Sequence, residues 1–162
     1  MPSIELRRRQ PISLVKDVEP DVRILDLVIG QQQIDEMEDW STVDAEELAN
    51  DVKQLICESD PEYRRYFNSQ PLDAQKITYE YDMYPAPIQG PEVGIHVLVC
   101  FAENWSKDWG GEFIAYEECE PSEVVASFPG RILIMTNNAW YKVSQPNVRA
   151  GTDLNYLFFR LI

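Results

Sequence analysis

The sequence predicts a mainly β fold, a jelly roll (double-stranded β-helix) of about eight strands with helices in its N-terminal third. Two observations support this fold class. From residue 76 onward, short strand-like runs alternate with turn residues such as Pro129-Gly130 and Asn137-Asn138. Before that point, residues 44–58 have the apolar spacing of an amphipathic helix. A helical segment followed by many short strands is typical of a β sandwich whose helices pack on one sheet.

Eight runs have the composition of strands, because they are short, rich in apolar or alternating residues, and bounded by turn residues. They are residues 22–29, 77–84, 95–102, 112–117, 124–128, 131–136, 140–144 and 154–161. Their number and short spacing predict two antiparallel sheets.

The helix predicted over residues 44–58 has a recognisable beginning. Asp44 is a suitable N-cap, and Glu47 follows three positions later, as in a capping box. One apolar stripe is formed by Leu48, Val52, Leu55 and Ile56. We expect this stripe to lie on one of the sheets. Pro61 is well placed to begin a second short helix over residues 61–67.

Composition divides the chain into an arm and one domain. Residues 1–20 are polar and contain Pro2, Pro11 and Pro20, so we expect an arm that is ordered by contact with another chain. Residues 21–162 contain no linker long enough to divide them, so we expect a single jelly-roll domain there.

Neither a signal peptide nor a membrane span is predicted. The N-terminal sequence MPSIELRRRQ has basic residues but no apolar stretch after them. No apolar run approaches the roughly 20 residues that a membrane span needs. We therefore expect a cytoplasmic or virion location and no membrane partner.

The chain is strongly acidic, with a formal net charge of −14. Such a surface repels phosphate backbones, so we expect no nucleic-acid partner. The one basic cluster consists of Arg7, Arg8 and Arg9. It is either a solubilising, locally paired part of the arm or a site that docks on an acidic partner, and both interpretations stay open.

The cysteine and histidine content limits the possible chemistry. Cys57, Cys100 and Cys119 are odd in number and lack CxxC spacing, which argues against a disulfide framework or a zinc site and favours reduced intracellular thiols. His96 is the only histidine. A site with two histidine ligands to iron or zinc is therefore excluded, and we expect His96 to be a core or strand-face imidazole.

The second half of the chain carries a series of motifs. They are IHVLVCFAENW at residues 95–105, WGGEF at 109–113, FPGRILIM at 128–135, Tyr141-Lys142-Val143, Arg149, and LNYLFFRL at 154–161. In this order and near these spacings, residues 77–162 resemble the prolyl-4-hydroxylase-like branch of the 2-oxoglutarate/Fe(II) oxygenases. The resemblance implies a jelly roll, and sequences that resemble this family are common in bacteriophages.

The resemblance also implies an iron site, and the sequence departs from it at each ligand. The family holds Fe(II) with two histidines and one carboxylate. Tyr141 stands at the position of the second histidine. Residues 84–93, where an H-x-D pair is expected, contain one carboxylate, Glu92, and neither histidine nor aspartate. We therefore interpret the chain as a degenerate member that binds no metal and no cofactor.

Three residues are candidates for a remnant of the family's pocket. Tyr141 is expected to fill the former metal cavity as a packed aromatic. Arg149 lies close to the position of the family's 2-oxoglutarate-binding residue, and it is either a surviving carboxylate binder or a structural salt-bridge partner. Arg131 belongs to the motif that resembles the family's P-x-x-G-R strand.

Two tyrosines are candidates for an interface. Tyr79 and Tyr81 alternate with Glu80 and Asp82, so they would share one face of a strand. That face either packs in the core or forms a contact surface, since tyrosine is enriched at interfaces.

These observations favour a catalytically inactive jelly roll that acts as a structural or binding subunit, with a bacteriophage virion or its assembly as the specific setting. We expect protein partners, in a larger assembly or a homo-oligomer. Two alternatives remain open: an atypical Fe(II)/2-oxoglutarate-dependent hydroxylase, and an iron-free sensor that binds 2-oxoglutarate through Arg149.

Overall fold

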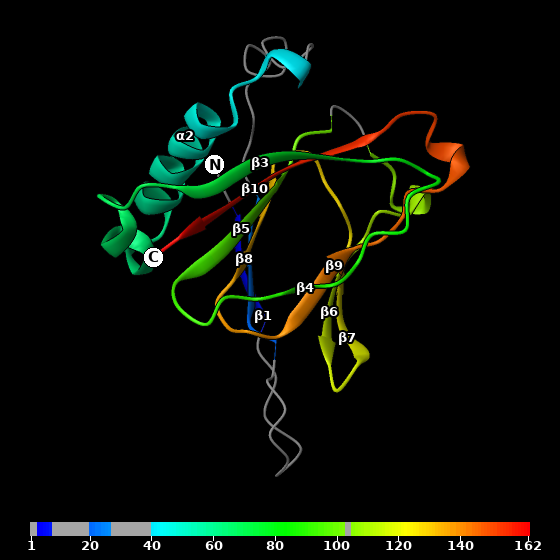
Figure 1. Cartoon of the computed structure of the whole chain (residues 1–162). Helices are drawn as coiled ribbons and strands as arrows, with labels where there is room; N and C mark the ends of the chain where they lie inside the picture. Colours follow the sequence, from blue (N-terminus) through cyan, green and yellow to red (C-terminus); the bar gives the residue numbers. More distant parts are fainter. Residues whose placement is uncertain (1–2, 8–19, 27–39, 103–104) are drawn as a thin grey trace.

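Figure 1 shows a computed structural model of the chain, which describes residues 3–7, 20–26, 40–102 and 105–162. The strands of the described residues are β1 (Ser3–Arg7), β2 (Val22–Asp26), β3 (Leu72–Tyr79), β4 (Ile88–Gln89), β5 (Ile95–Cys100), β6 (Phe113–Glu117), β7 (Glu120–Val125), β8 (Arg131–Met135), β9 (Trp140–Val143) and β10 (Leu154–Leu161). The helical elements are α2 (Ala45–Ser59) and the 3-10 helices η1 (Trp40–Thr42), η2 (Pro61–Tyr66), η3 (Lys107–Trp109) and η4 (Val148–Ala150). None of these described helices is long and apolar enough to cross a membrane.

The strands form two antiparallel sheets with jelly-roll connectivity. One sheet has the order β1-β2-β8-β5-β10-β3, and the other has the order β4-β9-β6-β7. From β3 onward the chain moves back and forth between them, so that β3-β10-β5-β8 faces β4-β9-β6-β7. This is the eight-stranded arrangement of two Greek keys that defines a jelly roll. The predicted fold class is therefore confirmed.

Each of the eight predicted runs overlaps a strand, and two of them are displaced by more than two residues. The run predicted at 77–84 begins earlier and ends at Tyr79, and the run predicted at 124–128 lies at 120–125. The two-residue strand β4 was not predicted, because it is defined only by its pairing with β9. Residues 27–29 of the first predicted strand lie outside the described residues.

Part of the arm predicted over residues 1–20, the segment Ser3–Arg7, lies in a strand. These residues form β1, an edge strand that pairs antiparallel with β2, Ser3 opposite Asp26 and Arg7 opposite Val22. The physical reason is visible in the sequence SIELR, where apolar and polar residues alternate as in a strand. Residues 1–2 and 8–19 lie outside the described residues, so an arm ordered by another chain stays a prediction for them.

Helix α2 lies against the outer face of the six-stranded sheet (Figure 1). The side chain of Asp44 accepts a hydrogen bond from the Glu47 backbone N–H at 3.1 Å, as the capping pattern predicts. The buried residues between helix and sheet, here called the helix layer, include Val52, Ile56, Tyr63, Ile132, Leu157 and Phe159. Pro61 begins η2, which confirms the predicted helical restart in 3-10 form.

The apolar stripe of α2 is only partly as predicted. Val52 and Ile56 are buried, Leu48 is half-buried, and Leu55 is 39% exposed. Cys57 is buried, although it is not part of the predicted stripe. The helix therefore sits slightly rotated from the orientation that the stripe alone predicts.

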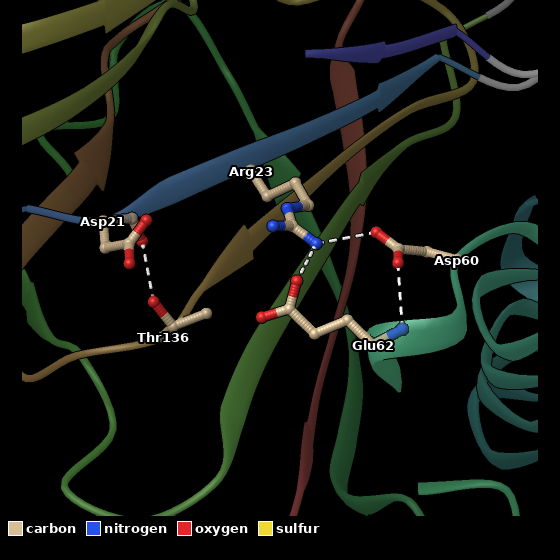
Figure 2. Close-up of polar contacts among 5 residues, drawn as sticks. All are labelled: Asp21, Arg23, Asp60, Glu62 and Thr136. Carbon is tan, nitrogen blue, oxygen red and sulfur yellow. Dashed lines mark hydrogen bonds and ion pairs between the residues drawn. The ribbon is translucent and has the colours of Figure 1, made fainter. Parts of the chain in front are cut away.

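An ion pair ties the end of α2 to the sheet at the margin of the helix layer. Figure 2 shows Arg23 of β2 directed at Asp60 and Glu62, with its Nη1 atom 2.7 Å from Asp60 Oδ2. Asp60 also caps η2 by accepting from the Glu62 backbone N–H at 3.0 Å. The Arg23 guanidinium lies over the ring of Tyr63, 5.4 Å from its centroid.

Candidate functional site

The space between the two sheets is the natural place to look for a site in a jelly roll. Alternate residues of β5, β8 and β10 point into it, because successive side chains of a strand lie on opposite faces. The buried residues there, here called the inter-sheet layer, include Leu98, Phe113, Leu133, Tyr141, Tyr156 and Phe158. Side chains from both sheets fill this space, so it is a packed layer.

Tyr141 lies at the centre of the polar contacts in this layer. It is fully buried on β9, opposite Ile88 of β4 in the strand register. Its ring stacks on Phe113 with centroids 5.5 Å apart. Its hydroxyl lies 3.0 Å from Nδ1 of His96, which comes from the facing strand β5. The prediction that this tyrosine fills the interior as a packed aromatic agrees with this placement.

His96 is a buried core residue, as expected from the sequence. Its ring contacts Phe158 edge-on with centroids 5.2 Å apart. The pKa of His96 is lowered from 6.5 to about 4, chiefly by burial and also by the Arg160 cation, while Asp73 opposes the shift. At neutral pH the imidazole is therefore uncharged. The same burial raises the pKa of Tyr141, so both partners of the pair stay neutral.

A second polar pair in the inter-sheet layer joins Ser127 to Tyr156. Ser127 donates its hydroxyl proton to the Gly111 carbonyl oxygen at 2.5 Å. Because a serine has one hydroxyl proton, the Tyr156 hydroxyl at 2.7 Å must donate to Ser127. Burial raises the pKa of Cys100 to about 11, so its thiol is protonated at neutral pH and is a poor nucleophile.

The residues of this interior do not fit the iron site of the resembled family. Within the described ranges, no three His, Cys, Asp or Glu side chains come together in a group that could hold a metal ion. His96 is bonded to Tyr141, and Glu92 is exposed. A neutral tyrosine and a single imidazole are a poor donor set for Fe(II).

Arg131 and Arg149, which were predicted as pocket remnants, lie apart from the hydrogen-bonded pair of His96 and Tyr141. Arg131 begins β8, and its Nε and Nη2 atoms donate to the two carboxylate oxygens of Asp26 at 2.7 and 2.9 Å. Its Nη1 atom donates to the Ala126 carbonyl oxygen at 2.9 Å. Arg149 is exposed on η4, before β10 begins, whereas Tyr141 is fully buried. The structure does not bring the three together, and binding of 2-oxoglutarate by Arg149 stays a prediction.

Of the predicted interface residues, Tyr79 and Tyr81 behave differently. Tyr79 is 4% exposed and packs edge-on against Tyr156, and burial raises its pKa to about 12. Of the two interpretations left open for Tyr79, its burial supports packing in the core. Tyr81 lies beyond the end of β3 and is 56% exposed.

The basic cluster of the N-terminal segment is only partly described. Arg7 is the last residue of β1. Arg8 and Arg9 lie outside the described residues, so their role at an interface stays a prediction.

A pocket that the sequence analysis did not predict is lined in part by residues of η4. Figure 1 shows η4 at the end of the sandwich far from α2. The volume of the pocket is about 420 Å³. We call it the rim pocket, and its lining residues are Tyr81, Asn147, Val148, Gly151, Thr152 and Asp153. Asn147 caps η4 and Gly151 ends it in the left-handed conformation, with φ of 65°. An Asn followed four residues later by a Gly was the available signal for this turn.

Fold and interior together define a jelly-roll protein whose inter-sheet space is closed by paired aromatic and polar side chains. No protein-family model matches the sequence, and no curated protein matches it. Among solved structures, the chain is similar to the crystal structure of an oxidoreductase of the 2OG-Fe(II) oxygenase family from Burkholderia pseudomallei. The identity is 12% and the TM-score 0.49, and the match covers 98% of this chain and 72% of that one.

Proposed function

We propose that this chain is a non-catalytic jelly roll that serves as a structural or binding subunit for other protein chains. The observation that carries the proposal is the filled interior. Tyr141 is fully buried, stacked on Phe113 and hydrogen-bonded to His96 at the place where the resembled family would need open metal ligands.

The protonation states of the interior support the same proposal. A general base needs a pKa near the working pH, and a cysteine nucleophile needs a lowered one. Here the pKa of His96 falls to about 4 and that of Cys100 rises to about 11. Each group is thus held in its neutral form, which suits packing better than proton transfer or attack.

As the setting of this subunit we propose a bacteriophage virion or its assembly, within the infected cytoplasm. The support is the sequence resemblance, since such sequences are common in bacteriophages. The net charge of −14 favours protein partners over nucleic acid. Association through a homo-oligomer or a larger assembly belongs to the same proposal.

The enzymatic alternative is tested by anaerobic reconstitution with Fe(II), followed by a sensitive assay for succinate formed from 2-oxoglutarate. We expect no stoichiometric iron and no succinate above a control without protein. Tyr141→His should not restore turnover, because residues 84–93 still lack the H-x-D pair. Iron bound in stoichiometric amount, or succinate formed without added substrate, would sink the proposal.

The subunit role and the sensor alternative need separate measurements. Sedimentation velocity over a concentration series should show self-association or a complex with a copurifying chain. A monomer that never associates would contradict the subunit role. Calorimetric titration with 2-oxoglutarate should show no binding. Binding that is lost in Arg149→Ala would replace the proposal with the iron-free sensor.

A further inference from the structure

The rim pocket is built from two segments that are far apart in the sequence. Tyr81 comes from the connection between β3 and β4, and the other wall comes from residues 147–153. Gln145 Nε2 donates a hydrogen bond to the Tyr81 carbonyl oxygen, which ties the two walls together. The side chain of Asn147 donates to the Asp108 carbonyl oxygen at 2.6 Å, which fixes the second wall to η3. A volume of about 420 Å³ is enough for a small ligand or a long side chain.

The lining of the pocket offers an aromatic ring and an unused carboxylate. Tyr81 is 56% exposed and Val148 is 72% exposed, so an apolar surface faces solvent there. Thr152 and Asp153 are exposed, and in the described part of the chain no hydrogen bond or ion pair is recorded for either side chain. Two polar groups therefore remain available to a ligand at a preformed pocket.

The charge around the pocket is negative. Exposed Glu80 and Asp82 flank Tyr81 in the sequence, and Asp153 lines the pocket together with Tyr81. Arg149 of η4 and Lys107 of the contacting helix η3 are exposed cations, and exposed Asp108 of η3 adds a fourth negative charge. The whole chain adds a net charge of −14, which attracts cationic ligands over a long range.

We propose that the rim pocket binds an arginine or lysine side chain from a basic segment of a partner protein. The face of a tyrosine ring attracts a cation, and a carboxylate accepts charge-assisted hydrogen bonds from it. Tyr81 and Asp153 supply these two groups, and Val148 covers the aliphatic part of the incoming side chain. The proposal deepens the proposed function, because it names the chemistry of the partner that the subunit would bind.

The test is a titration of the isotopically labelled whole chain, followed by NMR at low salt, with a short arginine-glycine peptide. The control ligand is the same peptide with neutral citrulline in place of arginine. We expect amide shifts at residues 80–82 and 147–153 with the arginine peptide and none with citrulline. Raising the salt from about 10 mM to about 100 mM shortens the Debye length from about 30 Å to about 10 Å, so binding should weaken.

Single-residue variants, with a matched control, test whether the arginine peptide binds at the rim pocket. Asp153→Asn should weaken binding about threefold to fivefold at low salt. Tyr81→Ala should weaken it about twofold to fivefold. Asp51→Asn, which removes the same charge from an exposed position on α2, should leave the affinity unchanged.

Equal binding of the citrulline peptide, equal effects of Asp153→Asn and Asp51→Asn, or shifts confined to another face would each overturn the proposal. So would a neutral sugar that shifts the same amides while the arginine peptide does not. The titration does not measure turnover, so its failure leaves the proposed function standing. Succinate formation would refute the proposed function without changing the titration.

Discussion

The six-stranded sheet has two buried faces, and they differ in polarity. The helix layer, between the sheet and α2, is apolar apart from a cysteine and tyrosines, and the ion pair of Arg23 and Asp60 lies at its margin. The inter-sheet layer holds polar pairs within it, His96 with Tyr141 and Ser127 with Tyr156. The same sheet therefore packs against a helix by hydrophobic contact and against the second sheet by a mixture of contacts.

The polar groups of the inter-sheet layer do not by themselves indicate a binding cavity. A buried polar group without a partner costs free energy, whereas a paired one is nearly neutral and restricts how the core can pack. Each of the four residues that form these two pairs has its partner inside the protein. These polar groups are hydrogen-bonded to other groups of the protein. The interior of this jelly roll therefore differs from an open binding cavity.

The largest expected effects come from one phenylalanine in each layer. Phe113 of the inter-sheet layer and Phe159 of the helix layer are both fully buried. Phe113→Ala and Phe159→Ala should each lower the free energy of unfolding by about 3–5 kcal/mol, because each leaves a large cavity. Urea denaturation followed by circular dichroism measures both. If the alanine variants do not fold, the leucine variants at the same positions give a smaller version of the comparison.

The two layers should differ in how strongly a mutation of their phenylalanine is coupled to a mutation of Tyr141. Phe113 stacks on Tyr141, so Phe113→Leu combined with Tyr141→Leu, which removes both rings of the stack, should show a non-additive effect of about 0.5 kcal/mol or more. Phe159→Leu combined with Tyr141→Leu should be additive, since Phe159 lies on the opposite face of the sheet. Equal coupling in both pairs would mean that the layers are not independent.

The second-largest expected effect is a dependence of stability on pH, which His96 of the inter-sheet layer causes. The pKa of His96 is about 4 in the folded protein and 6.5 in an ordinary setting. Between these values the unfolded chain binds more protons than the folded one, so stability rises with pH. The contribution of neutral His96 to the free energy of unfolding amounts to about 3 kcal/mol. It is complete above pH 6.5 and is lost as the pH falls to about 4.

Chemical denaturation at a series of pH values measures this contribution. His96→Gln should flatten the pH dependence between pH 4 and 6.5, whatever its effect on stability at neutral pH. The helix layer contains no histidine, since His96 is the only one in the chain. An unchanged slope in His96→Gln would show that carboxylates, and not the inter-sheet layer, cause the acid sensitivity.

The third expected effect concerns the ion pair of Arg23 and Asp60 at the margin of the helix layer. Arg23→Met keeps the apolar stem but removes the cation, which leaves the largely buried carboxylate of Asp60 without its ion pair. We expect a loss of about 1–3 kcal/mol in the free energy of unfolding. Glu62 is the exposed partner of Arg23, so Glu62→Gln is the control and should cost less than about 1 kcal/mol. Equal losses would mean that the pair acts as a surface salt bridge.

The features predicted from the sequence are those that local pattern determines. The cap of α2, the restart at Pro61 and the apolar strands follow from short-range spacing, and the structure contains them. The start of β3 was missed because residues 72–75 contain no β-branched or aromatic residue and lie on an edge strand, with Asp73 at a φ of 53°. Strand β1 was missed although its alternation was present, because nearby prolines suggested an arm.

The candidate site depended on contacts that no local pattern contains. His96 and Tyr141 are 45 residues apart and meet only because their strands lie in facing sheets. The rim pocket likewise joins Tyr81 to residues 147–153 through the fold. The sequence predicted that Tyr141 fills the former metal cavity, but it did not predict that His96 and Phe113 are its partners.

The smallest effect concerns the apolar stripe of α2, where pattern and structure disagree. Leu48→Ala should cost about 1–2 kcal/mol, because Leu48 is half-buried against the helix layer. Leu55→Ala should cost about 0.5 kcal/mol or less, since Leu55 is 39% exposed and alanine favours a helix slightly more than leucine does. Ile56→Ala, at a fully buried position, is the reference and should cost about 2–5 kcal/mol.

The order of these three losses, measured by urea denaturation, reports the rotation of α2 on the sheet. Leucines at i and i+7 of a helix lie nearly on one face, so the stripe alone predicts similar losses for Leu48 and Leu55. The structure predicts that Leu55 is the weaker of the two, because it lies on the solvent side of the stripe. A loss at Leu55 as large as that at Ile56 would place the helix in the orientation that the stripe predicts and would contradict the packing of the helix layer described here.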